Sequence, residues 1–248
     1  MLVGHHPFLR LLIKEIRSYF LTPMLYIIGA LFSLIIGWLF FNYLVMAKTP
    51  TDYSILETVV KPLMGNIHLL MIFIAPLLTM GTFAIERRNG TLDLLLMSPL
   101  RHRDIIAAKF LSIVAIIVFL LGLTTICPIT LYFSGIEGMA VVGSSYLGLL
   151  LCASSYAMIG IFTSSLTDNQ VIAAMVSFGI IILLTFCGLV PSFTNGQITA
   201  QLFQYFSPPF HLQPFIRGAI KSFDLLYFIT LPIYFMLLTH LSLESRRW

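Results

Sequence analysis

Six long runs of apolar residues, separated by short polar segments, set the pattern of the chain. A helix that crosses a bilayer needs about 20 consecutive, mostly apolar residues, and each run has about that length. A few prolines interrupt the runs, but neighbouring helices can satisfy the carbonyls that a proline leaves free. The pattern predicts an all-α polytopic membrane protein with six transmembrane helices in a single domain, residues 1–248. The predicted spans are residues 21–46, 63–85, 105–133, 139–166, 171–190 and 225–243.

The residues ahead of the first run follow a different pattern. Between residues 5 and 20, apolar side chains recur at spacings of three and four, whereas Arg10, Lys14 and Arg17 share the opposite face. This period predicts an amphipathic helix in the membrane interface, with its cations toward lipid phosphates or toward a partner protein. We call it the elbow helix.

Composition agrees with a membrane protein and excludes a soluble enzyme. Of the 248 residues, 58% are hydrophobic and only 10% are charged, whereas soluble domains carry roughly 25% charged residues. The three cysteines, Cys127, Cys152 and Cys187, lie inside apolar runs and form no CxxC pair. They indicate packing residues rather than a disulfide or a metal site.

The basic residues predict the orientation, because Lys and Arg near span ends concentrate on the cytoplasmic side. If the N-terminus is cytoplasmic, ten Lys and Arg residues lie in inside segments and four in outside segments. The ten are Arg10, Lys14, Arg17, Arg87, Arg88, Arg101, Arg103, Lys109, Arg246 and Arg247. The four are Lys48, Lys61, Arg217 and Lys221. Both termini are therefore predicted to be cytoplasmic.

The predicted cytoplasmic loop of residues 86–104 contains a short apolar helix. Gly90 allows a chain reversal, Thr91 suits the cap position of a helix, and Asp93 favours its positive end. The pair Ser98-Pro99 ends the helix. Its large apolar residues are Leu92, Leu94, Leu95, Leu96 and Met97. Such a helix either folds back on the membrane or inserts into a groove on another protein.

Charged residues also stand where the second span leaves the membrane, namely Glu86, Arg87 and Arg88. A lone acid at this depth is costly unless it is paired. These residues either form ion pairs across the joint or anchor the end of the span by snorkelling.

Three segments resemble ABC-2-type transporter permeases. Residues 86–99 read Glu-x-x-x-Gly-Thr-Leu-Asp-x-Leu-Leu-x-x-Pro and are followed by a basic turn and Lys109, similar to the coupling-helix region of that family. The turn Thr167-Asp168-Asn169-Gln170 is similar to the family's cytoplasmic turn between spans four and five. The outside segment, residues 191–224, resembles the segment before the last span through His211, Phe215, Arg217, Gly218 and Asp224. The closest resemblance is to the gliding-motility and copper-enzyme-maturation branch, although Gln213-Pro214 stands where that branch tends to carry an acidic residue.

The resemblance implies an ABC-2, type V exporter-like permease fold in a bacterial cytoplasmic (inner) membrane. It implies one half of a dimeric pathway, completed by a second copy or a related permease. Two copies of a separate cytoplasmic ABC ATPase subunit would hold the ATP and Mg and drive export. Residues 86–97 and 167–170 would form the coupling interface with that ATPase.

The chain itself is expected to be no enzyme and to hold no cofactor, metal or nucleic acid. The segment most similar to a phosphate-binding loop is Gly218-Ala219-Ile220-Lys221-Ser222. It lacks the glycine that precedes the lysine in such loops. The other expected contacts are membrane lipids and an extracytoplasmic partner. Within the outside segment, residues 197–205 and 211–221 are each predicted to form a short helix, with a break at Pro208-Pro209. The segment is interpreted either as a pair of re-entrant helices that seal the bundle or as a lid or partner-binding surface.

Small residues suggest close helix packing. Gly29, Ser33 and Gly37 lie four apart on the first span, and Ala173 and Ser177 lie four apart on the fifth. Small residues at this spacing let helix backbones approach closely. They either form the dimer interface or pack helices within one protomer.

Two rival functions stay open. One is a permease-like scaffold that transmits ATP-driven motion to an envelope partner without moving a solute. The other is an intramembrane enzyme, for which the sequence lacks HExxH and paired catalytic residues.

Overall fold

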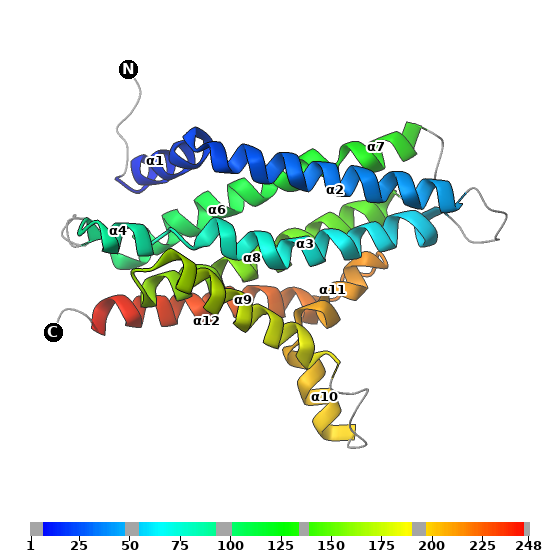
Figure 1. Ribbon diagram of the computed structural model, residues 1–248. Coiled ribbons are helices and arrows are strands. Elements are labelled where there is room, and N and C mark those ends of the chain that lie inside the picture. The colour runs from blue at the N-terminus through cyan, green and yellow to red at the C-terminus, as the bar shows by residue number, and fades with distance from the viewer. Residues whose placement is uncertain (1–6, 48–54, 93–100, 134–138, 190–196, 246–248) are drawn as a thin grey trace.

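The computed structural model describes residues 7–47, 55–92, 101–133, 139–189 and 197–245, and these ranges contain helices and turns but no strand (Figure 1). The first half comprises α1 (Pro7–Leu21), α2 (Pro23–Ala47), the π-helical turn η1 (Leu56–Val60), α3 (Lys61–Thr79), α4 (Ala84–Arg88), α6 (His102–Thr124) and α7 (Ile126–Phe133). The second half comprises α8 (Met139–Leu166), α9 (Gln170–Cys187), α10 (Gln197–Phe206), α11 (Pro208–Ile216) and α12 (Ser222–Glu244).

The prediction of six membrane-spanning segments in an all-helical chain is confirmed. Six segments of the described chain are long and apolar enough to cross a bilayer. They are Pro23–Ala47, Leu56–Arg88, His102–Phe133, Met139–Leu166, Gln170–Cys187 and Ser222–Glu244. The second is longer than predicted at both ends, because η1 and the start of α3 extend it back to Leu56 and α4 continues it, beyond a break at residues 80–83, to Arg88.

A serine on α8 stabilises that break in the second span. The Ser164 hydroxyl donates to the carbonyl of Met80 at 3.0 Å. It accepts hydrogen bonds from the backbone N–H groups of Phe83 at 3.0 Å and Ala84 at 3.1 Å. Backbone groups released inside a membrane need such partners, so the interruption between α3 and α4 is held in place by the neighbouring helix.

Helix α8 occupies the middle of the bundle and contacts α3, α6, α9, α11 and α12. Its sequence is rich in small residues on every side, and most of them are buried. Small side chains let five neighbours approach one helix backbone closely. The buried small residues of α8 include Ser144, Ser145, Gly148, Cys152, Ala153, Ser154, Ser155, Ala157, Gly160, Ser164 and Ser165.

Two glycines of α8 mark the closest approaches. A Cβ atom at Gly160 would lie 1.9 Å from Thr79 Oγ1 of α3, and one at Gly148 would lie 2.5 Å from Phe215 Cβ of α11. Neither distance is compatible with a side chain, so both glycines are required for packing within the chain.

The small residues considered for a dimer interface pack mainly within the protomer, which was the alternative interpretation. Ala173 and Ser177 are almost fully buried, and a second copy cannot reach them in this arrangement. Gly29 is also buried, and a Cβ there would contact Leu120 of α6 at 3.5 Å. Ser33 is half-buried. Gly37 alone of the five is exposed, and a Cβ added there would have no atom within 4 Å.

The elbow helix is present as α1, and it lies along α6. Leu11 is buried, whereas Arg10, Lys14 and Arg17 are exposed. The Tyr19 hydroxyl donates to the carbonyl of Leu78 at 3.1 Å and so joins α1 to the end of α3. Burial, together with nearby carboxylates, raises the pKa of Tyr19, so this hydroxyl stays protonated and remains a donor.

The outside segment contains two short helices, α10 and α11. The second begins at Pro208, whereas the sequence predicts a break at Pro208-Pro209 and a helix over residues 211–221. The correction has a simple cause: a proline is well suited to the first turn of a helix, where its missing N–H is not needed. Gly218, with φ +83°, follows the end of α11, so that helix stops before residue 221.

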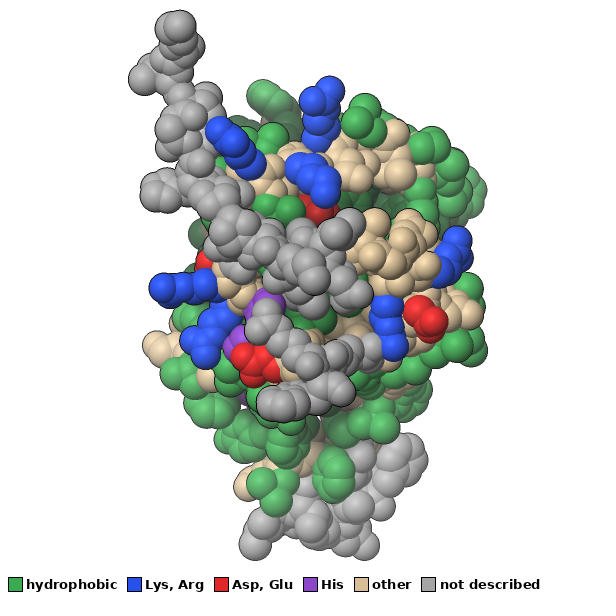
Figure 2. All heavy atoms as spheres, turned by 90° about the vertical axis from the view of Figure 1, so that its left-hand side faces the viewer, with side chains coloured by type: hydrophobic (Ala, Val, Ile, Leu, Met, Phe, Trp, Pro, Cys, Tyr) green, Lys and Arg blue, Asp and Glu red, His purple; other side chains and the backbone are tan. Residues whose placement is uncertain are grey.

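The start of α1, the whole of α4 and the last turn of α12 lie at one end of the bundle (Figure 1). Figure 2 looks onto this end and shows Lys and Arg side chains spread across it, with apolar side chains around its flanks. We call this the basic end.

Replacing Gly160 with Ala should lower the free energy of unfolding by about 1–3 kcal/mol, because the new methyl group overlaps Thr79. Thermal unfolding of the purified protein in detergent measures the change. Gly179→Ala on α9 is the matched control, since no atom lies within 4 Å of its Cβ position. The control should be neutral or slightly stabilising, and equal melting of the two variants would contradict the close contact.

Candidate functional site

The two loops assigned to ATPase coupling begin at the basic end of the bundle. One follows α4, and the other is the turn of residues 167–170 between α8 and α9. The structure joins their starting points directly, because the Arg87 guanidinium donates to the carbonyl of Leu166 at 3.0 Å. Arg88 is exposed beside it.

Helix α4 ends in a left-handed turn at Gly90, whose φ is +68°. The N–H of Thr91 donates to the carbonyl of Glu86 at 2.9 Å, and the N–H of Gly90 donates to that of Arg87 at 3.1 Å. This pair of bonds is the Schellman arrangement, which requires a residue that tolerates positive φ. The Thr91 hydroxyl also donates to the Glu86 carbonyl at 3.2 Å. Thr91 therefore caps the C-terminal end of α4 with both its N–H and its side chain.

The apolar helix predicted after Gly90 lies mostly outside the described residues. Leu92 is described and is largely buried. The remaining assigned residues, Asp93, Leu94, Leu95, Leu96 and Met97, fall within the part of the chain that the structure does not describe.

The turn of residues 167–170 is built around the start of α9. Asn169 caps that helix, its side-chain oxygen accepting from the N–H of Val171 at 2.9 Å. The Thr167 hydroxyl accepts from the N–H of Asn169 at 3.2 Å. Asp168 is exposed, and Gln170 contributes to the wall of a cavity that α1 and α4 also line.

A buried lysine ties the surrounding elements together. Only 2% of the Lys109 side chain is exposed. Its Nζ atom lies 2.7 Å from Glu86 Oε1 of α4, 3.4 Å from Glu15 Oε1 of α1 and 2.9 Å from the carbonyl of Thr82. It also sits 5.2 Å from the centre of the Phe83 ring. We call Lys109, Glu86 and Glu15 the ion cluster.

The ion cluster answers the question that the sequence left open about Glu86. Glu86 is paired within the chain, and its partner is the lysine that opens the third span. The sequence alone predicts neither an ion pair for Lys109 nor a role for Glu15. The signal that could have found them is the position of Lys109 inside an apolar run, because an ammonium there needs a carboxylate nearby.

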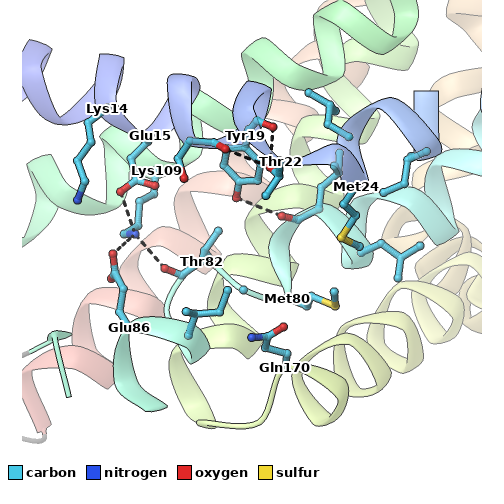
Figure 3. Close-up of a pocket in the computed structure, with 17 residues that line it drawn as sticks. Lys14, Glu15, Tyr19, Thr22, Met24, Met80, Thr82, Glu86, Lys109 and Gln170 are labelled. Atoms are coloured by element: carbon cyan, nitrogen blue, oxygen red, sulfur yellow. Dashed lines mark hydrogen bonds and ion pairs between the residues drawn. The ribbon is translucent and has the colours of Figure 1, made fainter. Parts of the chain in front are cut away.

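A cavity of about 320 Å³ adjoins the ion cluster. Figure 3 shows it between α1, the start of α2, the end of α3, α4, α6 and the first residue of α9. Its charged lining residues are Lys14, Glu15, Glu86 and Lys109. We call it the elbow cavity.

The residues singled out in the outside segment come together at the opposite end of the bundle. His211 Nδ1 lies 2.7 Å from Asp224 Oδ1, and the His211 ring stacks on Tyr227 with centroids 4.0 Å apart. Phe215 is fully buried, and its carbonyl accepts from the Ser144 hydroxyl at 2.8 Å. Arg217 is exposed and takes no part in this packing. These contacts join α11 to α8 and α12.

The described residues contain no group of three or more His, Cys, Asp or Glu side chains that could hold a metal ion. Within the described part of the chain, Lys109 and His211 each make direct side-chain and backbone contacts.

Among the described residues, six segments long enough to span a membrane, an amphipathic helix packed against them and two loops linked at one end agree with the membrane component of a transporter. The model of the ABC-2 family transporter proteins matches residues 9–218. The chain therefore belongs to this family, and its fold is the ABC-2 permease fold. A comparison with curated proteins gives no match. Membership means that the protein is a multi-pass membrane subunit that works with an ABC ATPase subunit.

Replacing Lys109 with Met should lower the free energy of unfolding by about 3–5 kcal/mol, because Glu86 and Glu15 lose their buried cation. Thermal unfolding in detergent at neutral pH measures the loss. The double variant Lys109→Met with Glu86→Leu should recover part of it, since one unpaired carboxylate is then also removed. If Lys109→Met alone is as stable as the parent protein, the ion cluster does not hold these helices together.

Proposed function

We propose that the chain forms one half of a dimeric export pathway whose transport cycle is driven by two copies of a separate ABC ATPase subunit. The chain hydrolyses no ATP in this proposal, and ATP and Mg bind to the partner. The observation that supports it best is the connection of both coupling loops to the transmembrane helices at the basic end.

That connection explains how a force on the loops would reach the helices. Residues 91–97 would insert into a cleft on the ATPase, where each buried leucine contributes about 1.5–3 kcal/mol before ordering costs. The base of this loop is fixed by the Schellman turn at Gly90 and by the Glu86–Lys109 ion pair. Movement of the loop would therefore move α6 and α1 together with α4.

The second loop would move with the first. Arg87 of α4 holds the carbonyl of Leu166 at the end of α8, directly before the turn of residues 167–170. A single ATPase surface that contacts both loops would shift α8 and α9 relative to the rest of the bundle. This would change access to a pathway between two protomers.

The charge distribution supports a cytoplasmic location for both termini, and the family resemblance supports a bacterial inner membrane. Among the described residues, the basic end carries Arg10, Lys14, Arg17, Arg87, Arg88, Arg101, Arg103 and Lys109. The described cations of the other end are Lys61, Arg217 and Lys221. Because basic residues favour the cytoplasmic side, the basic end would face the ATPase.

A second protomer would cover apolar surface that this chain leaves open. On α2 the side chains of Leu34, Trp38 and Phe41 are all more than 60% exposed, and Gly37 lies among them. This face of α2 supports the proposed dimer better than Gly29, Ala173 or Ser177 does. The three motif segments together support placement in the gliding-motility and copper-enzyme-maturation branch, although Gln213-Pro214 departs from that branch within the outside segment.

The first test is copurification of the ABC ATPase with the tagged chain from its native membrane. Replacing Leu95 with Asp should abolish copurification, because a charge cannot be buried in an apolar cleft without a partner. Leu95→Met is the matched control, since it keeps the volume and the apolar surface, and it should copurify normally. Normal copurification of Leu95→Asp would contradict the proposed interface.

The second test addresses coupling rather than binding. Replacing Gly90 with Val should leave the ATPase bound but abolish stimulation of its hydrolysis by the permease, because Val is strained at φ +68° and alters the loop's exit direction. ATP hydrolysis by the purified complex in lipid vesicles measures the effect. Gly218→Val, at the other positive-φ glycine, imposes similar strain at the opposite end of the bundle and should retain stimulation. Equal loss in both variants would indicate general destabilisation instead.

A further inference from the structure

The elbow cavity combines a charged end with an apolar end. At one end stand Glu86, Glu15, Lys109 and Lys14, and at the other the walls are formed by Leu25, Ile28 and Leu77. Its volume of about 320 Å³ is at the lower end of the range for small-molecule sites, about 300–1,000 Å³. This division suits a molecule with a polar headgroup and an apolar chain.

Only one ammonium group is in direct contact with the two carboxylates of the charged end. Two carboxylates, Glu86 and Glu15, share the single ammonium of Lys109. Glu86 Oε1 accepts from that ammonium, but Glu86 Oε2 is buried and receives no hydrogen bond from any described residue. A buried acceptor without a donor is unfavourable. A ligand that brings a cationic hydrogen-bond donor would supply the partner that Glu86 Oε2 lacks.

Lys14 supplies the complementary charge. It is exposed on α1, one turn before Ser18, and both residues line the cavity. In Figure 3 the Lys14 side chain extends from α1 toward the end of the cavity where Glu15 and Glu86 lie. No described residue forms a salt bridge or hydrogen bond with its ammonium. A phosphate at this rim of the cavity would find a cation that makes no direct ion pair, although it lies near enough to Glu86 to interact with it electrostatically.

The apolar end opens toward the membrane. Met24 of α2 and Leu77 of α3 line the cavity and are each 41% exposed. Both belong to membrane-spanning segments, so their exposed surfaces face acyl chains or a neighbouring helix. A chain attached to a headgroup in the cavity can leave between these residues without crossing polar surface.

We propose that the elbow cavity binds a bilayer phospholipid with a primary ammonium headgroup, of the phosphatidylethanolamine class. The Glu86 carboxylate turns so that Oε2 faces the cavity and accepts from the ammonium. The phosphate lies near Lys14, and an acyl chain passes along Leu25, Ile28 and Leu77. Phosphatidylcholine fits less well, because its quaternary ammonium has no N–H to donate. Phosphatidylglycerol has no cation for Glu86. This site goes beyond the proposed transport function and does not depend on it.

The headgroup preference is tested by native mass spectrometry of the intact chain released from lipid nanodiscs. The discs contain phosphatidylethanolamine, phosphatidylcholine and phosphatidylglycerol with identical acyl chains in equal amounts. We expect phosphatidylethanolamine to be retained roughly tenfold more than phosphatidylcholine, which is the effect of one charge-assisted hydrogen bond. Equal retention of these two lipids would overturn the proposal.

The location is tested by two substitutions that leave the ion cluster intact. Ser18→Phe fills the cavity from an exposed position on α1 and should remove the preference for phosphatidylethanolamine. Lys14→Gln should lower retention of both zwitterionic lipids several-fold, because both carry the phosphate. Arg17→Gln is its matched control, since Arg17 lies on the same helix but outside the cavity.

The outcomes separate a built site from general attraction to the membrane. If Arg17→Gln lowers retention as much as Lys14→Gln, the effect is non-specific electrostatics and the proposal is wrong. If Ser18→Phe leaves the lipid preference unchanged, the preferred lipid binds elsewhere and the proposal is equally wrong. Thermal unfolding in parallel confirms that each variant is folded, and Glu86→Gln, where it folds, should bring the ratio of the two zwitterionic lipids close to one.

Discussion

The arrangement of this permease at its basic end depends on one buried ammonium. Lys109 lies inside a membrane-spanning helix, 2% exposed, where a charge is tolerated only with partners of opposite sign. The chain supplies Glu86 from α4, Glu15 from α1 and the carbonyl of Thr82 between α3 and α4. No two of these partners lie on the same helix. Satisfying one charge therefore brings the elbow helix and the base of the loop that follows α4 to fixed positions on α6.

The same requirement recurs through the rest of the bundle, with α8 as the common support. Ser164 satisfies backbone groups at the break before α4, and Gly160 lets α3 approach within contact distance. At the far end, Ser144 and Gly148 hold Phe215 of α11, and the His211–Asp224 pair joins α11 to α12. Elements that lie at opposite ends of the molecule are thus all fixed to one central helix. A displacement of α8 at the basic end would reach α11 through packed contacts rather than through flexible chain.

The sequence predicts the helices well and the contacts between them poorly. A bilayer requires long apolar runs, so the six spans can be identified from composition alone, and the elbow helix follows from its period of three and four. The ion cluster cannot be identified this way, because Glu15 and Lys109 are 94 positions apart and only the fold makes them neighbours. The small residues show the same limit: Gly29 and Gly37 share a motif, yet one packs on α6 and the other is exposed. The prediction of a break at Pro208 is also wrong, because this proline begins α11 instead of ending a helix.

The elbow cavity and the base of the coupling loop share one residue, Glu86, and this has a thermodynamic consequence. Glu86 uses one carboxylate oxygen for Lys109 while its backbone carbonyl closes the turn at Gly90. A headgroup bound to the other carboxylate oxygen would favour whichever position of α4 gives it the better geometry. Linkage then requires that the position of α4 changes the affinity for the headgroup by the same factor. Because α4 carries the loop proposed to contact the ATPase, lipid occupancy and ATPase engagement would influence each other through this one glutamate, with no further element needed between them.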